Sequence, residues 1–179
     1  PLGSAANFAT RQGRVSAELM AAAADADLVL VGSSGHGPVL SSGNRLGSTA
    51  RAVMERAARP VLVIRHGLPA ARPVAVLFDG SPAARRALVL AARLAVVTGS
   101  RLDIITLAAD QETARIRERD ARALIAPVAV AVESTAVTAV ADPARVAAEA
   151  PNHPLALLVL PESARHLMEL LPCSVVVVP

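Results

Sequence analysis

An internal repeat constrains the fold of this chain more than any other feature of its sequence. Residues 49–64, TARAVMERAARPVLVI, align without a gap to residues 163–178, SARHLMELLPCSVVVV, at an offset of 114. The apolar segments that precede them, residues 27–32 and 157–161, align at an offset of 129. The two offsets differ by 15 residues, which the first copy keeps and the second has lost. Chance similarity of two helix–strand units is the alternative, but the ungapped length and shared order of elements favour a duplicated unit.

Short apolar runs alternate with helical patterns along the whole chain, and this alternation predicts an α/β fold with a doubly wound parallel sheet. The expected helices and strands are these. Buried strands are expected at 28–31, 60–64, 74–78, 102–107, about 134–140, 155–160 and 174–178, with one more near 7–12. Helices are expected at 15–25, 49–58, between Ser81 and Gly99, at 111–125, after Asp142–Pro143, and at 163–171.

These elements divide the chain into two repeated modules, the first of them incomplete. Residues 1–4, PLGS, resemble the remnant of a cleaved affinity tag. Residues 5–66 form the back part of the first module, residues 67–73 a Pro-containing linker, and residues 74–179 the second module. The second module has a strand–helix–strand–helix stretch at 74–125 without a counterpart upstream, so we expect the front of the first module to be missing from this sequence.

Composition excludes several classes of protein. All 18 basic residues are arginine, and without lysine no P-loop or Schiff-base chemistry is possible. The net charge is only +3 and the only aromatic rings apart from histidine are Phe8 and Phe78, so we expect no nucleic-acid partner. No apolar run approaches the roughly 18 residues of a membrane span. A single cysteine, Cys173, and no secretory signal favour a cytoplasmic protein.

A glycine- and serine-rich loop after the strand at 28–31 is the first candidate binding site. Its glycines allow positive φ and close approach of backbone N–H groups to a ligand, and the helix that follows favours an anion. Ser48 and Thr49 can cap that helix and donate to a phosphate oxygen, and Arg45 or Arg51 can supply a cation. The alternative is a surface loop that connects the strand to the helix and binds no ligand. The predicted nucleotide-binding residues of this loop are Gly32, Gly35, Gly37, Gly47, Ser48 and Thr49.

Asp79 is the second candidate, because it follows the strand at 74–78, at the sheet end where open α/β sheets bind ligands. The alternative is that Asp79 forms an Asx turn with Gly80 and helps to cap the next helix. The loop and Asp79 belong to different copies, so neither copy holds a complete site.

Catalytic and metal-binding arrangements are not evident. The sequence has no G-x-S-x-G motif, and its four histidines lack the spacing of zinc ligands. Cys173 precedes a buried strand and is interpreted as a small core residue. We therefore expect no enzyme and no metal, with weak ATP hydrolysis as the one activity left open.

Residues 26–65 and 74–88 resemble the universal stress protein family. The first stretch resembles that family's closing strand, its glycine loop of pattern G-x2-G-x9-G-[S/T], its last helix and its dimerisation strand. The second resembles its opening strand with an aspartate. Eleven residues separate Gly35 from Gly47, and the nine-residue spacing holds only from Gly37. The resemblance implies a Rossmann-like fold of the adenine-nucleotide α-hydrolase-like type. It also implies that the protein binds ATP or AMP in stress signalling, and that Asp79 contacts the adenine base.

The terminal strand of each copy is apolar, and an exposed apolar edge invites pairing with another strand. The resemblance implies that modules join antiparallel through these strands, Val61–Ile64 and Val175–Val178. Both lie in one chain, so we expect an intramolecular pseudo-dimer. The alternative function is a nucleotide-free assembly or regulatory domain of a larger protein.

Overall fold

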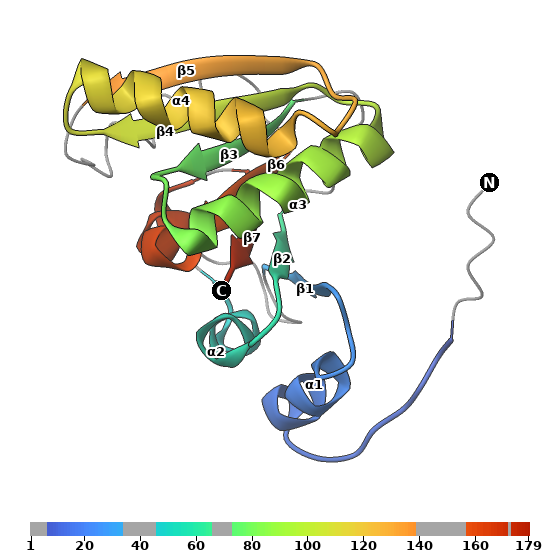
Figure 1. Ribbon diagram of the computed structural model, residues 1–179. Coiled ribbons are helices and arrows are strands. Elements are labelled where there is room, and N and C mark those ends of the chain that lie inside the picture. The colour runs from blue at the N-terminus through green and yellow to red at the C-terminus, as the bar shows by residue number, and fades with distance from the viewer. Residues whose placement is uncertain (1–6, 34–45, 66–72, 139–156, 172) are drawn as a thin grey trace.

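A computed structural model describes residues 7–33, 46–65, 73–138, 157–171 and 173–179. These residues build one seven-stranded sheet in the order β1-β2-β7-β6-β3-β4-β5 (Figure 1). The strands are β1 (Val29–Gly32), β2 (Val61–Ile64), β3 (Val74–Phe78), β4 (Leu102–Ala108), β5 (Val132–Thr138), β6 (Leu157–Pro161) and β7 (Ser174–Val178). The helices are α1 (Val15–Ala23), α2 (Ser48–Arg56), α3 (Pro82–Thr98), α4 (Gln111–Ile125) and a 3₁₀ helix, η2 (Glu162–Leu170).

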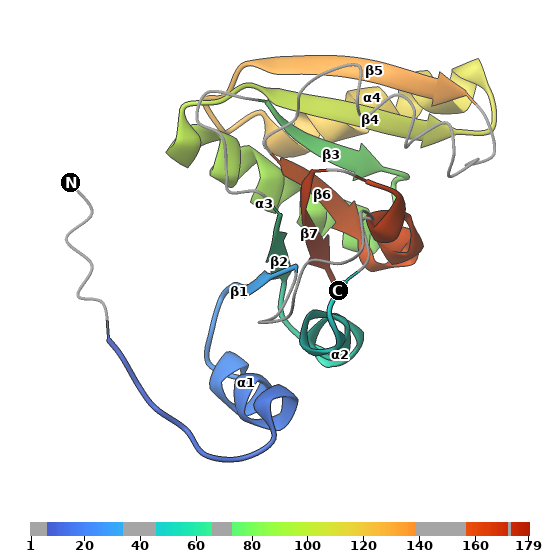
Figure 2. The same cartoon turned by 180° about the vertical axis from the view of Figure 1, so that it is seen from behind.

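Both faces of the sheet bury apolar side chains, as the unbroken apolar strands predict. Helices α3 and α4 cover one face, and Figures 1 and 2 show them together on that side. Residues of α1, α2 and η2 pack in the cluster on the opposite face. Side chains alternate between the two clusters along each strand; in β7, for example, Val175 and Val177 face α2 and η2, whereas Val176 and Val178 face α3. The predicted doubly wound α/β fold is confirmed.

The two copies meet at the only antiparallel pair of the described sheet. Strand β2 pairs with β7, with Val61 opposite Val177, Leu62 opposite Val176 and Val63 opposite Val175. Every other described pair of strands is parallel. Consequently β1 and β2 run in the opposite direction to the other five described strands. The carboxyl ends of these two groups of strands therefore point in opposite directions.

The caps of α3 follow the sequence prediction. The Ser81 hydroxyl accepts a hydrogen bond from the Ala84 N–H at 3.2 Å, and Pro82 is the first helical residue. Gly99 ends the helix in the left-handed region, with φ 65°.

The strand expected near residues 7–12 is not formed, and that prediction is wrong. The stretch runs outside the sheet (Figure 1), and Phe8 is 94% exposed. In the register of the repeat, residues 7–9 correspond to 136–138 of β5, and among the described strands β5 has β4 as its single partner. The described residues hold no first-copy counterpart of β4. Without a neighbouring strand the backbone groups of residues 7–12 gain nothing from leaving water.

The segment expected to be helical at 163–171 is a 3₁₀ helix that begins one residue earlier, at Glu162. It stops before Leu171, which is extended with φ −97° and ψ 133°. Leu171 precedes a proline in the sequence, and a residue before proline disfavours helical angles. The helix expected after Asp142–Pro143 and nearly all of the expected linker lie outside the described residues.

Candidate functional site

The predicted glycine loop joins a strand end to a helix start, as expected. Strand β1 ends at Gly32 and α2 begins at Ser48. The ends of the loop are hydrogen-bonded to each other, because the Gly47 N–H donates to the Ser33 carbonyl at 2.8 Å. The Ser33 N–H in turn donates to the Ile64 carbonyl of β2 at 2.9 Å. Gly35, Gly37 and Arg45 lie outside the described residues.

Positive φ angles are not found at the two described glycines of this loop, Gly32 and Gly47, so that expectation is wrong for them. Gly47 has φ −63° and ψ 156°, which any residue adopts. Its N–H is occupied by Ser33. Gly47 therefore leads the chain into α2 without offering its own N–H group to a ligand.

The start of α2 is an anion-favouring helix end without a side-chain cap. Gly47 occupies the N-cap position, so the prediction that Ser48 or Thr49 caps the helix is wrong. The first-turn N–H groups of Ser48, Thr49 and Ala50 have no partner within the helix, and the first turn contains no acidic residue. Ser48 is exposed and Thr49 is half-buried. This helix end carries a partial positive charge that no side chain of the first turn neutralises.

The cation expected from Arg51 is already engaged. Its Nη2 lies 2.6 Å from Oε1 of Glu169 in η2, and both side chains are about half exposed. This ion pair spans a groove of about 410 Å³ between α2 and η2, next to Leu46 at the end of the loop. The positive charge of Arg51 is therefore already partly balanced by Glu169.

Asp79 adopts the Asx turn that was the alternative interpretation. Its Oδ1 accepts a hydrogen bond from the Ser81 N–H at 2.9 Å, and Gly80 between them has φ 83°. The Asp79 side chain is half-buried at the carboxyl end of β3. At least one of its oxygens is thus used in positioning the start of α3.

Arg117 of α4 also lies near the carboxyl end of β3, and sequence reasoning missed it. Its Nη1 donates to the Leu107 carbonyl near the end of β4. Its Nε lies 3.4 Å from the position that a Cβ atom on Gly80 would take. The side chain therefore bridges the ends of β3 and β4 beside Asp79. No motif marks it, because one arginine among the many of α4 looks like a solvated residue.

The structure does not bring the loop and Asp79 together. Strands β2, β7 and β6 lie between β1 and β3, and β1 runs opposite to β3. The carboxyl ends of β1 and β3 therefore point in opposite directions. The start of α2, with Gly47, Ser48 and Thr49, lies on one side of the sheet's strand ends and Asp79 lies on the other. The described ends of the loop and Asp79 therefore do not form one site.

Arg65 is a second residue that sequence reasoning missed. It directly follows β2 and is only 6% exposed. Its N–H donates to the Ser174 hydroxyl at 3.0 Å and its Nη2 to the Met168 carbonyl at 3.1 Å. Burial lowers the pKa of Arg65, against the smaller opposing influence of Cys173 and Glu169. Burial also raises the pKa of the Cys173 thiol. These contacts fix the end of the first copy to the second.

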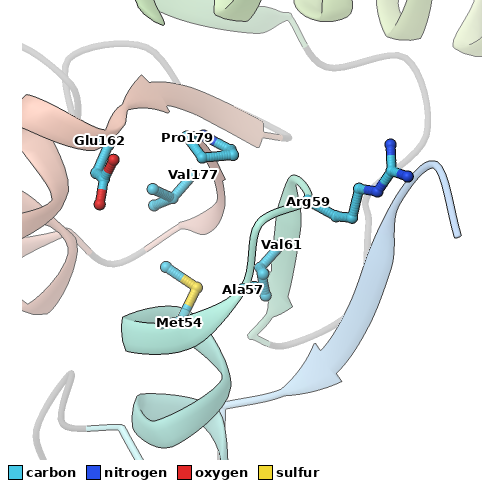
Figure 3. Close-up of a pocket in the computed structure, with 7 residues that line it drawn as sticks. All are labelled: Met54, Ala57, Arg59, Val61, Glu162, Val177 and Pro179. Carbon is cyan, nitrogen blue, oxygen red and sulfur yellow. The ribbon is translucent and has the colours of Figure 1, made fainter. Parts of the chain in front are cut away.

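The junction of the copies is closely packed. Figure 3 shows Met54, Ala57 and Val61 of the first copy facing Val177 and Pro179 of the second. The space that these residues line is about 10 Å³, no more than one water molecule needs. It is not a nucleotide site.

Membrane-spanning helices and metal-ligand groups are both absent from the described part of the chain. None of its helices has the length and apolarity to cross a bilayer. Its His, Cys, Asp and Glu side chains form no group of three that could hold a metal ion.

Part of the chain resembles a known protein family. Residues 6–65 match the family model described as the universal stress protein family. This part of the chain is therefore similar to universal stress proteins in sequence. The matched residues contain the loop ends and all of α2, so the helix end described above lies within the part of the chain that resembles this family. Among curated proteins, none matches the chain.

Solved structures extend the fold to both copies. A universal stress protein from Archaeoglobus fulgidus DSM 4304 has a TM-score of 0.68 and 21% identity over 91% of this chain. A putative universal stress protein from Pseudomonas aeruginosa UCBPP-PA14 has a TM-score of 0.65 and 14% identity over 94% of this chain and 69% of its own. The chain spans 64% of the length of the Archaeoglobus protein. A further universal stress protein from Archaeoglobus fulgidus, in complex with dAMP, has a TM-score of 0.51 and 16% identity, covering 60% of this chain and 98% of its own.

Proposed function

We propose that this chain is a non-catalytic, cytoplasmic universal stress protein module that binds the phosphate of AMP or ATP at the start of α2 and acts in stress signalling. Three observations support the proposal. The family match covers the whole of α2, a solved universal stress protein is in complex with dAMP, and the helix end is chemically suited to an anion.

The observation that carries the proposal is the uncapped, acid-free first turn of α2. Ser, Thr, Asp and Asn are the preferred N-cap residues, and α3 has Ser81 and α4 has Asp110 at this position. At α2 the N-cap is Gly47, which has no side chain. A phosphate placed there would receive hydrogen bonds from N–H groups that otherwise depend on water.

The second copy lacks this chemistry. Pro161, with no N–H, directly precedes η2, and Glu162 puts a carboxylate into its first turn. In the register of the repeat, Glu162 is the equivalent of Ser48. The second copy serves instead as a built-in partner, since its terminal strand β7 pairs with β2 as the two halves of a dimer would.

Isothermal titration calorimetry with AMP and ATP tests the nucleotide site. Wild type is expected to bind with micromolar affinity. Ser48→Glu, which places the second copy's residue in the first copy, is compatible with a helix start and introduces a negative charge. It should weaken binding by about tenfold, because it cancels about 1–2 kcal/mol of favourable helix-end electrostatics. Ser48→Gln is the matched control, of the same size as glutamate without the charge, and should weaken binding clearly less than Ser48→Glu, because it removes the Ser48 hydroxyl but adds no negative charge.

The runner-up is a nucleotide-free assembly domain, and two contacts favour it. The Gly47 N–H is used by Ser33, and Arg51 is paired with Glu169. Absence of heat with wild type at millimolar AMP and ATP would select this second function. Steady release of phosphate from ATP would contradict the non-catalytic assignment.

A further inference from the structure

Helix α3 presents arginine and valine side chains to solvent and contains no acidic residue. Its three arginines give it a charge of +3, which equals the net charge of the whole chain. Because an α-helix turns once in about 3.6 residues, these arginines share one arc of the helix with three valines. The arc includes Arg85, Arg86, Val89, Arg93, Val96 and Val97. All are exposed except Val89, which is half-buried. Figure 1 shows α3 running across the front of the molecule beside α4.

The arginines of this arc have no acidic side chain as a partner. Among the described residues, Arg85, Arg86 and Arg93 form no ion pair with an aspartate or glutamate. The neighbouring helix differs, because Arg122 of α4 pairs with Glu118 at 3.2 Å. Helix α4 thus neutralises part of its charge on its own surface, whereas the positive charges of α3 stay unpaired.

Arg93 is the most available of the three arginines. The Arg85 Nε donates to the Gly80 carbonyl at 3.4 Å, and two nitrogens of Arg86 donate to the Pro179 carbonyl at 3.0 and 2.6 Å. Arg93 makes no comparable contact within the described part of the chain. Its guanidinium therefore keeps all of its donors for an anionic group outside this chain.

Exposed apolar side chains lie next to Arg93. Val97 is 72% exposed and Val96 is 47% exposed. They follow Arg93 by four and three positions, so they are its neighbours on the helix surface. Arginine is enriched in protein–protein interfaces, where it surrounds or joins apolar contacts. A helix face that is only solvated carries polar and charged residues at such positions instead.

The charges select among the partners that this face could bind. Symmetric pairing with α3 of a second copy would bring the three arginines of each helix together without a carboxylate, which is repulsive. An anionic membrane fits poorly, because Arg93 lies between Val89 and Val97 on the arc and would enter the apolar layer with them. A protein partner can place carboxylates opposite the arginines and apolar side chains opposite the valines.

We propose that the exposed arc of α3 binds an acidic amphipathic helix of a partner protein. Carboxylates of that helix pair with Arg93 and Arg86, and its apolar side chains contact Val96 and Val97. The 17 residues of α3 span about 25 Å, which accommodates a partner helix of four to five turns. Helix α2 packs in the cluster on the opposite face of the sheet, so this surface is separate from the nucleotide site proposed above.

The experiment uses a fluorescently labelled synthetic helix of about 18 residues, matched to α3 in length. One face of the peptide carries glutamate and leucine, and the other carries alanine and glutamine. Fluorescence anisotropy at low salt should show binding to wild type. Arg93→Glu should weaken binding by at least about tenfold, because it places like charges opposite each other. Arg56→Glu, at an exposed position of α2, makes the same change in net charge and is the matched control that should bind nearly as well as wild type.

A charge swap separates a docking site from general electrostatic attraction. A peptide whose central glutamate is replaced by arginine should bind wild type weakly and Arg93→Glu more tightly. Val97→Ser should also weaken binding of the original peptide, because the apolar contact is lost. Equal binding of the original peptide by wild type and Arg93→Glu would overturn the proposal, as would absence of binding to wild type. Binding of wild type to phosphatidylserine vesicles without binding to the peptide would assign this face to a membrane and overturn it as well.

Discussion

Leu62 of β2 lies directly opposite Val176 of β7, and the two residues occupy the same position of the internal repeat. On one side of this pair, Val61 lies opposite Val177, the repeat equivalent of Val63. On the other side, Val63 lies opposite Val175, the repeat equivalent of Val61. The pairing is therefore symmetric about the Leu62–Val176 pair. The two strands therefore have the local two-fold symmetry of an antiparallel pair of equivalent strands.

The symmetry does not extend to the ion pairs across the groove. Arg51 forms an ion pair with Glu169. The repeat equivalents of these two residues are Arg165 and Glu55, so a symmetric junction would also contain an ion pair between Arg165 and Glu55. Instead Arg165 lies 3.9 Å from Glu162 and 3.5 Å from the Met54 carbonyl. The copies thus share the register of their strands but differ at the surface, where a solvated ion pair stabilises little.

A charge in the centre of this junction should unfold the protein. Val176 is fully buried in the cluster under α3, so Val176→Asp leaves a carboxylate without a partner in an apolar environment. We expect a loss of at least about 3 kcal/mol in the free energy of unfolding, measured in urea. Leu170→Asp, at an exposed position of η2, is the control and should cost much less. An unchanged urea midpoint for Val176→Asp would show that the two copies do not depend on the junction.

The buried guanidinium of Arg65 gives a second test of how the copies are fixed together. Arg65→Ala removes the hydrogen bond to the Met168 carbonyl and leaves a space, and should cost about 2–3 kcal/mol in the free energy of unfolding. Arg65→Met fills the space and removes a charge that burial disfavours, so it should cost clearly less. Urea denaturation of both variants checks this. Equal destabilisation by the two variants would show that the hydrogen bond, which both lack, dominates over packing.

Local signals in the sequence were sufficient for many elements. The bounds of α4 and of β7 agree with those predicted, because capping residues and apolar runs specify them locally. The strand expected at 7–12 fails because strand formation depends on a neighbour that local sequence does not reveal. Arg65 and Arg117 were missed for the same reason. Their partners, Met168 and Leu107, lie 103 and 10 residues away, and only the fold brings them together.

The glycines of the chain differ in what they contribute, and paired substitutions can show it. Gly99 has φ 65°, and a Cβ atom added there meets no other atom within 4 Å. Gly99→Ala should therefore cost about 1 kcal/mol through backbone strain alone. Gly47, with φ −63°, should tolerate alanine without that strain. Thermal denaturation of the two variants measures the contrast. Equal destabilisation would show that Gly47 adopts a conformation other than the extended one.

Cys173 should make the stability of the protein depend on alkaline pH. Burial raises the pKa of its thiol in the folded state above the value of about 8.5 expected when unfolded. The unfolded state therefore loses its proton first, and the stabilisation, complete below that value, is lost as pH rises through the folded pKa. The free energy of unfolding should decline above about pH 8.5, and Cys173→Ala should remove this part of the decline. Urea midpoints measured across alkaline pH for both proteins check it. Parallel curves would contradict the assignment, because the thiol would then titrate alike in both states.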